Sequence, residues 1–192
     1  MGGVSYSKGS LVAGCAHRVH GNNSFVSGSN NLVIGRNSHA EGYSNKVYGA
    51  SAHVEGDSNI AVNNNTHAEG DTTQAIGEGS HSEGRDTIAF GEFSHAQGDE
   101  SKATGEGSFA GGFESEAVGD YSSALGMHVK TPDIEGSLAC GMYNSPTNNP
   151  YFSVGNGWTD DGRENLFEVG ADAGTIINTD VKITGITNIP QL

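Results

Sequence analysis

The sequence predicts an all-β fold, a parallel β-roll (a β-solenoid) built from 14-residue coils. Three observations predict it: a glycine at every seventh position, two alternating five-residue patterns that end on these glycines, and small residues at fixed places inside both patterns. The glycines occupy positions 14, 21, 28, 35, 42, 49, 56, 70, 77, 84, 91, 98, 105, 112, 119 and 126. Self-similarity at a short fixed period indicates a solenoid in which each coil packs on its neighbours.

The glycines predict a series of turns. Asn63 is the one departure from the ladder. Asparagine tolerates a left-handed backbone better than most residues do. We therefore expect a positive φ at the ladder positions.

The two alternating patterns predict two short strands per coil. One reads Ser38-His39-Ala40-Glu41-Gly42, and the other reads Asn45-Lys46-Val47-Tyr48-Gly49. Side chains alternate between the two faces of a strand, so the first, third and fifth residues of each pattern share one face. Because that face carries only Ser, Thr or Asn, then Ala or Val, then Gly in nearly every copy, we expect it to line a narrow lumen.

Composition and charge exclude several classes of protein. Only 34% of the residues are hydrophobic and 30 of 192 are glycine, yet the strict repeat register argues against disorder. A formal net charge of -14 disfavours nucleic acid and anionic membranes as partners. No apolar run is long enough for a membrane span, so we expect no membrane insertion.

An apolar column predicts an oligomer interface. The residue before the glycine of the second pattern faces outward and is apolar in most coils. A long exposed apolar stripe is rare on monomers. We therefore expect contact with further copies of the chain at Ile34, Tyr48, Val62, Ile76, Phe90 and Val118.

The pentads resemble the YadA-type head repeat of trimeric autotransporter adhesins. The Thr73-Gln74-Ala75-Ile76-Gly77 segment carries the resemblance most clearly, and the repeat covers about residues 10–141. The resemblance implies a left-handed parallel β-roll, a homotrimer packed side by side about a threefold axis or intertwined, and a passive role in attachment.

A variant of this repeat points to bacteriophage and prophage tail and appendage proteins. The His-Ala-Glu-Gly motif is similar to that variant, as are the segments Phe152 to Gly157 and Arg163 to Val169. The resemblance implies a non-enzymatic tail-fibre or appendage module on a virion or cell surface, which attaches to a host-cell receptor, with a glycan as the candidate receptor. The alternative is the head of a bacterial trimeric autotransporter adhesin.

The repeat pattern divides the chain into four parts. We expect an N-terminal segment at 1–9, the β-roll at 10–141, a Pro/Asn-rich connector at 142–150 and a small trimerising β neck at 151–192. In the neck, β-propensity and turn residues predict strands at Tyr151 to Val154, Leu166 to Val169, Thr175 to Ile177 and Val181 to Thr184.

An outward ladder of histidines and glutamates is the most conspicuous polar feature. One coil separates its histidines, and each of the first four has a glutamate two residues on: His39, His53, His67, His81 and His95, with Glu41, Glu55, Glu69 and Glu83. A five-fold repeat favours stacked structural imidazoles, while a transition-metal array stays open as the alternative. If the imidazoles stack, we expect the assembly to loosen below about pH 6.

Catalytic motifs are missing from the sequence. It contains neither a nucleophile elbow placed between a strand and a helix nor a phosphate-binding loop. We therefore expect no catalytic residue and no cofactor. A polysaccharide-acting enzyme is the less favoured alternative, because a seven-residue period does not match the coils of such solenoid enzymes.

Overall fold

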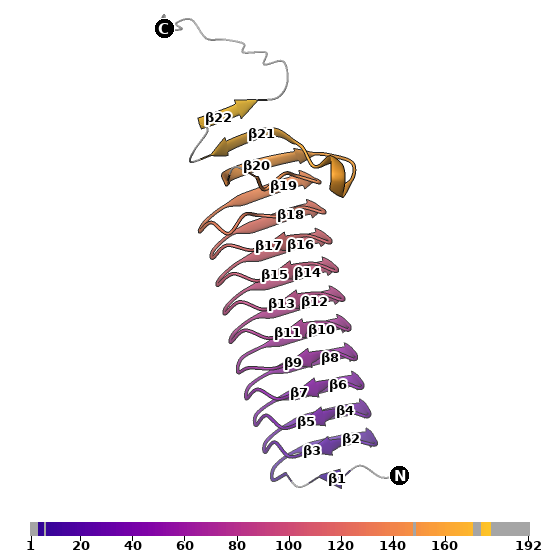
Figure 1. Cartoon of the computed structure of the whole chain (residues 1–192). Coiled ribbons are helices and arrows are strands. Elements are labelled where there is room, and N and C mark those ends of the chain that lie inside the picture. The colour runs from indigo at the N-terminus through magenta and orange to yellow at the C-terminus, as the bar shows by residue number, and fades with distance from the viewer. Residues whose placement is uncertain (1–3, 6, 148, 171–173, 178–192) are drawn as a thin grey trace, which may run out of the picture.

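The protein is a straight rod of stacked coils. A computed structural model describes residues 4–5, 7–147, 149–170 and 174–177. Figure 1 shows the coils stacked along one axis, with β1 (Val4–Ser5) at one end and β22 (Gly174–Ile177) at the other. The described residues form two sheets and no α-helix; all strand pairs are parallel except the last two of the larger sheet, which are antiparallel. This confirms the all-β solenoid.

The first pattern forms the longer strands, which make a 13-stranded sheet, called here the long sheet. Most of these strands have five residues, and the glycine of each pairs with the glycine of the next coil, as Gly70 does with Gly84. The strands are β2 (Leu11–Cys15), β4 (Phe25–Ser29), β6 (His39–Tyr43), β8 (His53–Asp57), β10 (His67–Asp71), β12 (His81–Arg85), β14 (His95–Asp99), β16 (Phe109–Phe113), β18 (Ser123–Met127), β19 (Leu138–Met142), β20 (Pro150–Asn156), β21 (Asn165–Gly170) and β22.

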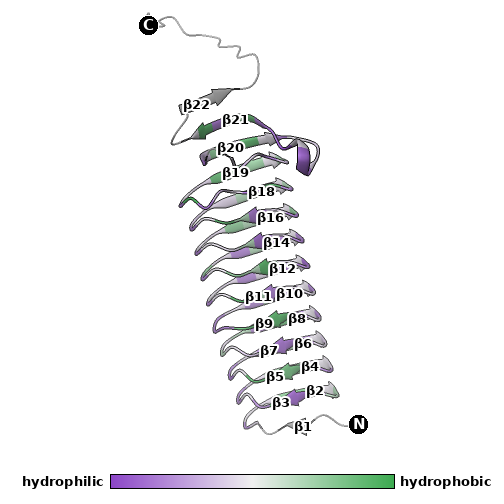
Figure 2. Cartoon of the chain, viewed as in Figure 1, coloured by the Kyte–Doolittle hydropathy of each residue, from purple (hydrophilic) through white to green (hydrophobic). Residues whose placement is uncertain are grey.

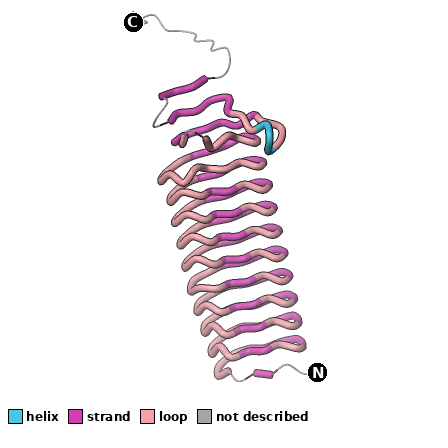
Figure 3. Tube along the Cα trace, viewed as in Figure 1, coloured by secondary structure: helices cyan, strands magenta, loops and turns pink. Residues whose placement is uncertain are grey.

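The second pattern forms two-residue strands that make a nine-stranded sheet, called here the short sheet. Its strands are β1, β3 (Arg18–Val19), β5 (Leu32–Val33), β7 (Lys46–Val47), β9 (Ile60–Ala61), β11 (Gln74–Ala75), β13 (Ile88–Ala89), β15 (Lys102–Ala103) and β17 (Glu116–Ala117). Figure 3 shows how loops join one long and one short strand into each flattened coil.

Strand pairing keeps every repeat in register. His67 pairs with His53 on one side and with His81 on the other, and Ala75 pairs with Ala61 and Ala89 in the same way. Each residue therefore stacks on its counterpart fourteen positions away, and every outward position becomes a column along the rod.

The lumen holds the side chains that the alternation predicts. Valines fill it near the N-terminal end, as at Val26 and Val47, and alanines fill it further on, as at Ala75 and Ala96; all four are fully buried. Burial of such small groups yields modest hydrophobic stabilisation per residue, so stability must accumulate over many coils.

Many of the buried polar side chains are satisfied by hydrogen bonds within and between coils, although the hydroxyls of Ser80 and Ser137 have no partner among the described residues. The Asn45 side chain donates to the carbonyls of Glu41 and Gly56, and its oxygen accepts from the Asn59 N–H. Ser38 donates through its hydroxyl to the Gly49 carbonyl. Buried polar groups are destabilising unless paired, which explains why Asn, Ser and Thr occupy this lumen position.

The expected positive φ at the glycine ladder is wrong for half of the ladder. Glycines that end the long-strand pattern have positive φ, such as Gly70 at 114°, whereas Asn63 and the glycines of the short-strand pattern do not. The glycines of the short-strand pattern instead leave little space for a side chain: a Cβ built on Gly77 would lie 2.0 Å from the Gly91 carbonyl oxygen. Close stacking of coils, and not backbone handedness, favours glycine at these positions, of which Asn63 is the one exception.

The left-handed turn residue lies two positions after each ladder glycine. This position has positive φ in successive heptads whatever its side chain, as in Ser51 (55°), Thr72 (61°), Phe93 (56°) and Tyr121 (55°). Bulky residues rarely adopt this conformation. The stacked coils on both sides hold the backbone there through bonds such as Phe93 N–H to the Glu78 carbonyl.

The roll continues beyond its last regular glycine. β18 and β19 pair with a fifteen-residue offset, Gly126 opposite Gly141, and β20 then pairs in parallel with β19, Gly141 opposite Gly155. β21 and β22 follow in antiparallel pairing, so the three described strands of the expected neck join the long sheet. The expected strand Val181 to Thr184 lies outside the described residues, and the division into four parts stays a prediction.

Candidate functional site

The outer surface of the short sheet carries the apolar column of Ile34, Tyr48, Val62, Ile76, Phe90 and Val118. Each residue directly follows a short strand. The N–H groups of the first five continue the ladder, as in Ile76 to the Ala89 carbonyl and Phe90 to the Ala103 carbonyl, whereas the Val118 N–H donates to the Thr131 hydroxyl. The side chains remain accessible, with Phe90 58% exposed and Ile34 47% exposed. The structure therefore brings all six together in one outward column.

The neighbouring column on the same face is not uniformly apolar. Figure 2 shows hydrophobic strands such as β5 and β9 interleaved with hydrophilic strands such as β3 and β7. The first residue of each strand accounts for this, as in Leu32 and Ile60 against Arg18 and Lys46. The apolar surface is consequently a stripe, flanked by a mixed column.

The outer surface of the long sheet carries the histidine column, which consists of His39, His53, His67, His81 and His95. Each histidine opens a five-residue strand, and the strand register places its ring over the next. Ring centroids are 4.5 Å apart for His39 and His53, 4.7 Å for His53 and His67, 4.4 Å for His67 and His81, and 4.5 Å for His81 and His95. This spacing follows from the separation of paired strands, about 4.8 Å.

Phenylalanine rings close both ends of the imidazole stack. Phe25 meets His39 edge to face at 4.8 Å, and Phe109 meets His95 at 5.2 Å with an interplanar angle of 90°. This contact was not predicted, although the sequence contains its signal: Phe25 and Phe109 occupy the same pattern position as the histidines.

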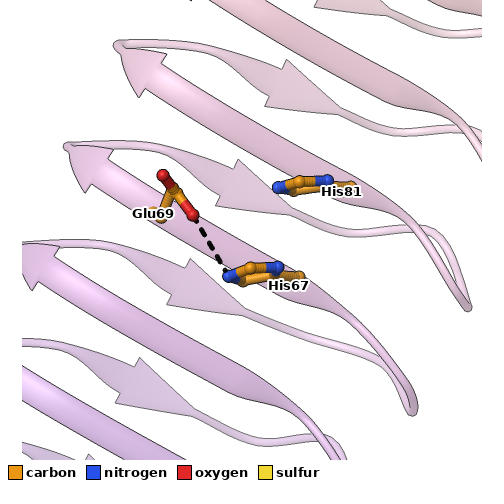
Figure 4. A group of neighbouring side chains, drawn as sticks. All are labelled: His67, Glu69 and His81. Carbon is orange, nitrogen blue, oxygen red and sulfur yellow. Dashed lines mark ion pairs between the residues drawn. The ribbon is translucent and has the colours of Figure 1, made fainter.

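Glutamates form a second column beside the imidazoles, the carboxylate column of Glu41, Glu55, Glu69 and Glu83. The closest histidine Nε2 to glutamate Oε2 distance is 3.4 Å, between His67 and Glu69 (Figure 4). Glu83 lies between two rings, 3.9 Å from His81 Nε2 and 3.6 Å from His95 Nε2. All five Nε2 atoms are shielded from solvent and make no hydrogen bond to protein.

Packing lowers the pKa of the three central histidines. Burial is the largest cause of the lowered pKa values of His53, His67 and His81, and the neighbouring imidazoles lower them further. The nearby glutamates act in the opposite direction but do not prevail. These three imidazoles are therefore held neutral at pH 7, so each keeps one ring nitrogen with a free lone pair.

An open groove runs beside the carboxylate column. Its lining combines ladder glycines with outward carboxylates and one amide. The lining residues are Glu69, Glu83, Gly84, Gln97, Gly98 and Gly112.

A second aromatic group at the C-terminal end of the roll was not predicted. The His128 ring stacks on Tyr143 at 4.3 Å, and the Arg163 guanidinium lies over the Tyr143 ring. Arg163 also donates to the His128 carbonyl and pairs with Asp160. Thirty-five residues separate Arg163 from His128, and no sequence pattern indicates the contact.

The repeat units match a known family. The model of the YadA head domain repeat matches residues 68–94, 91–115 and 103–128. These coils match the YadA head repeat. The pairing of β2 through β18 shows that coils outside the matched segment follow the same 14-residue register. No curated protein matches the chain.

The family describes a surface-exposed, adhesin-like structural module. The matched segment contains part of both outer columns, including Ile76 and Phe90 on the short sheet and His81 and His95 on the long sheet. Within the described residues, no helix has the length and hydropathy to cross a membrane.

Proposed function

We propose that the protein is a non-enzymatic homotrimeric rod that holds an attachment surface away from the particle or cell carrying it. The observation that carries the proposal is the apolar column of the short sheet. It runs along the rod in one register, and residues such as Ile34, Tyr48 and Phe90 are more than a third exposed in the single chain.

Three copies bury this column efficiently. A narrow lumen of alanine, valine and serine supplies little apolar burial for each coil, so contact between chains adds the stabilisation that large core residues supply in other folds. Closed symmetry about a threefold axis also avoids an open-ended assembly. YadA head repeats belong to proteins that assemble this way.

The function that follows is attachment to a host surface, on a phage or prophage tail fibre or appendage. The His-Ala-Glu-Gly repeats favour that origin, and a bacterial trimeric autotransporter head is the second candidate. Catalysis is disfavoured because a repeated outward ladder offers the same groups on every coil. A host-surface glycan fits the strongly acidic rod better than a polyanion does.

The trimer test is a charge substitution within the apolar column. In Ile76→Asp/Phe90→Asp, six carboxylates would face one another at the axis, so we expect a monomer where the unmodified protein has three times the chain mass by light scattering. Phe93→Asp is the matched control, because Phe93 lies in a turn of the next half-coil, is 66% exposed and has a left-handed φ that aspartate tolerates. A monomeric unmodified protein would refute the proposal.

The attachment test is binding of the trimer to intact host cells and to a glycan array. We expect saturable binding to cell-surface glycans with no turnover of the bound sugar. Release of reducing ends from the array would overturn the non-enzymatic assignment.

A further inference from the structure

The most informative group outside the proposed interface is the C-terminal part of the histidine and carboxylate columns. Two sets of three side chains place one potential ligand atom each within 4.8 Å of the others: His67, Glu69 and His81, and then His81, Glu83 and His95. Among the described residues, the earlier rungs, His39 with Glu41 and His53 with Glu55, do not form such a set.

We propose that this segment binds one divalent transition-metal ion of the zinc class for each chain, through two imidazole Nε2 atoms and one glutamate carboxylate. Imidazole and carboxylate together suit Zn²⁺, Co²⁺ and Ni²⁺. The site is formed by two adjacent coils, so it exists only in the folded solenoid.

The state of the Nε2 atoms supports the assignment. His67, His81 and His95 each direct a solvent-shielded Nε2 toward the carboxylate column without a hydrogen bond to protein. A buried polar atom without a partner is destabilising, and a metal ion gives it one. Figure 4 shows His67 and His81 presenting the same ring edge on the side where Glu69 lies.

Metal binding requires a change in the orientation of one imidazole ring. His67 and His81 are inclined by only 5°, so their lone pairs run nearly parallel, whereas His81 and His95 are inclined by 18°. A tetrahedral ion with metal–nitrogen distances of about 2.1 Å needs convergent lone pairs, so one ring must turn out of the stack. Glu83, within 4 Å of both His81 and His95, needs the smallest movement.

The adjoining groove gives the ion access and room for water. It is lined by Glu69, Glu83 and Gln97 together with glycines. A fourth ligand position open to this groove would be filled by water, as in zinc sites with three protein ligands.

His81 makes the two sets mutually exclusive. Its single Nε2 belongs to both, so an ion held by His67 and His81 prevents a second ion between His81 and His95. The expected stoichiometry is one ion for each chain, and two independent ions would contradict the shared ligand.

The experiment is titration of the intact, tag-free protein with Zn²⁺ in a calorimeter, together with the visible spectrum of Co²⁺. We expect saturable binding of one ion for each chain and the intense absorption of four-coordinate Co²⁺. His81→Gln should weaken Zn²⁺ binding at least tenfold. His53→Gln is the matched control, since His53 stacks between two imidazoles but belongs to neither set, and it should change affinity less than twofold.

A second pair of variants keeps the proposal testable if His81→Gln does not fold. Glu69→Gln/Glu83→Gln should weaken Zn²⁺ binding at least tenfold, while Glu41→Gln/Glu55→Gln should leave it within twofold. Equal losses in both pairs, or no saturable binding by the unmodified protein, would overturn the proposal. Since the site lies within one chain, a monomeric protein that binds one ion refutes the trimer and leaves this inference intact.

Discussion

The two outer faces of the roll share a backbone repeat and a lumen but differ in chemistry. On the short sheet, the column before the glycine is apolar and exposed, as at Ile34 and Phe90. On the long sheet, the equivalent column is carboxylate and lies beside stacked imidazoles. Inward positions must fit the narrow lumen, whereas outward positions are constrained only along their own column. The difference teaches that one coil geometry can present two surfaces of different chemistry.

The largest expected effect comes from changing the backbone that both faces share. Gly70→Val should destabilise the protein by about 4 kcal/mol or more, because a Cβ there would lie 2.0 Å from the Gly84 carbonyl oxygen and φ is 114°. Urea unfolding followed by circular dichroism measures the change. Asp71→Val, one residue on and exposed, should cost less than about 1 kcal/mol; equal effects would show that stacked glycines do not set the coil geometry.

The second-largest effect is a loss of stability that should differ between the two sheets when the first residue of a strand is replaced by alanine. His67→Ala removes the central ring of the imidazole stack, with its neighbours at 4.7 and 4.4 Å. It should destabilise the protein by about 1 to 2 kcal/mol, because stacked aromatic pairs contribute roughly 0.5 to 1.5 kcal/mol each.

Gln74→Ala supplies the comparison on the short sheet. Gln74 is likewise the first residue of its strand but has no ring to stack, so the cost should be within about 0.5 kcal/mol. Thermal unfolding of both variants decides the point, and a Gln74→Ala loss as large as that of His67→Ala would remove the distinction between the faces.

The smallest effect is a pH dependence that should reside in the long-sheet face. His53, His67 and His81 have lowered pKa values in the folded protein, through burial and then neighbouring imidazoles. The folded state therefore binds protons less readily than the unfolded state. The contribution of these histidines to stability is complete above pH 6.5, the histidine pKa of the unfolded chain. It falls as the pH drops below 6.5, until the histidines of the folded protein are protonated as well.

Metal-free protein, unfolded in urea between pH 8 and pH 5, measures this dependence. The groups that face the rings are Glu55, Glu69 and Glu83, which soften the loss because they favour protonated imidazole. Replacing all five column histidines by glutamine should flatten the profile over this window. A profile unchanged by that replacement would assign the pH dependence to other groups.

Particular residues show which structural features could be predicted from the sequence. The burial of Ala75 and Ala96 and the outward direction of His67 and Phe90 follow from strand alternation. The φ values at Asn63 and Phe93 do not follow, because the sequence marks where a turn occurs but not which of its residues takes the left-handed conformation. The contact of Arg163 with His128 and Tyr143 could not be predicted from the sequence either.

The sequence by itself determined the coil, its lumen and the identity of every outward column, because a period of fourteen residues turns local alternation into a repeating structure. Only the tertiary structure decided what each column contacts. Stacking of coils aligned five imidazoles, gathered His67, Glu69 and His81 within 4.8 Å and favoured glycine at positions without positive φ. Those outcomes depend on distances between coils of a few ångströms, which residue identities along a single strand do not contain.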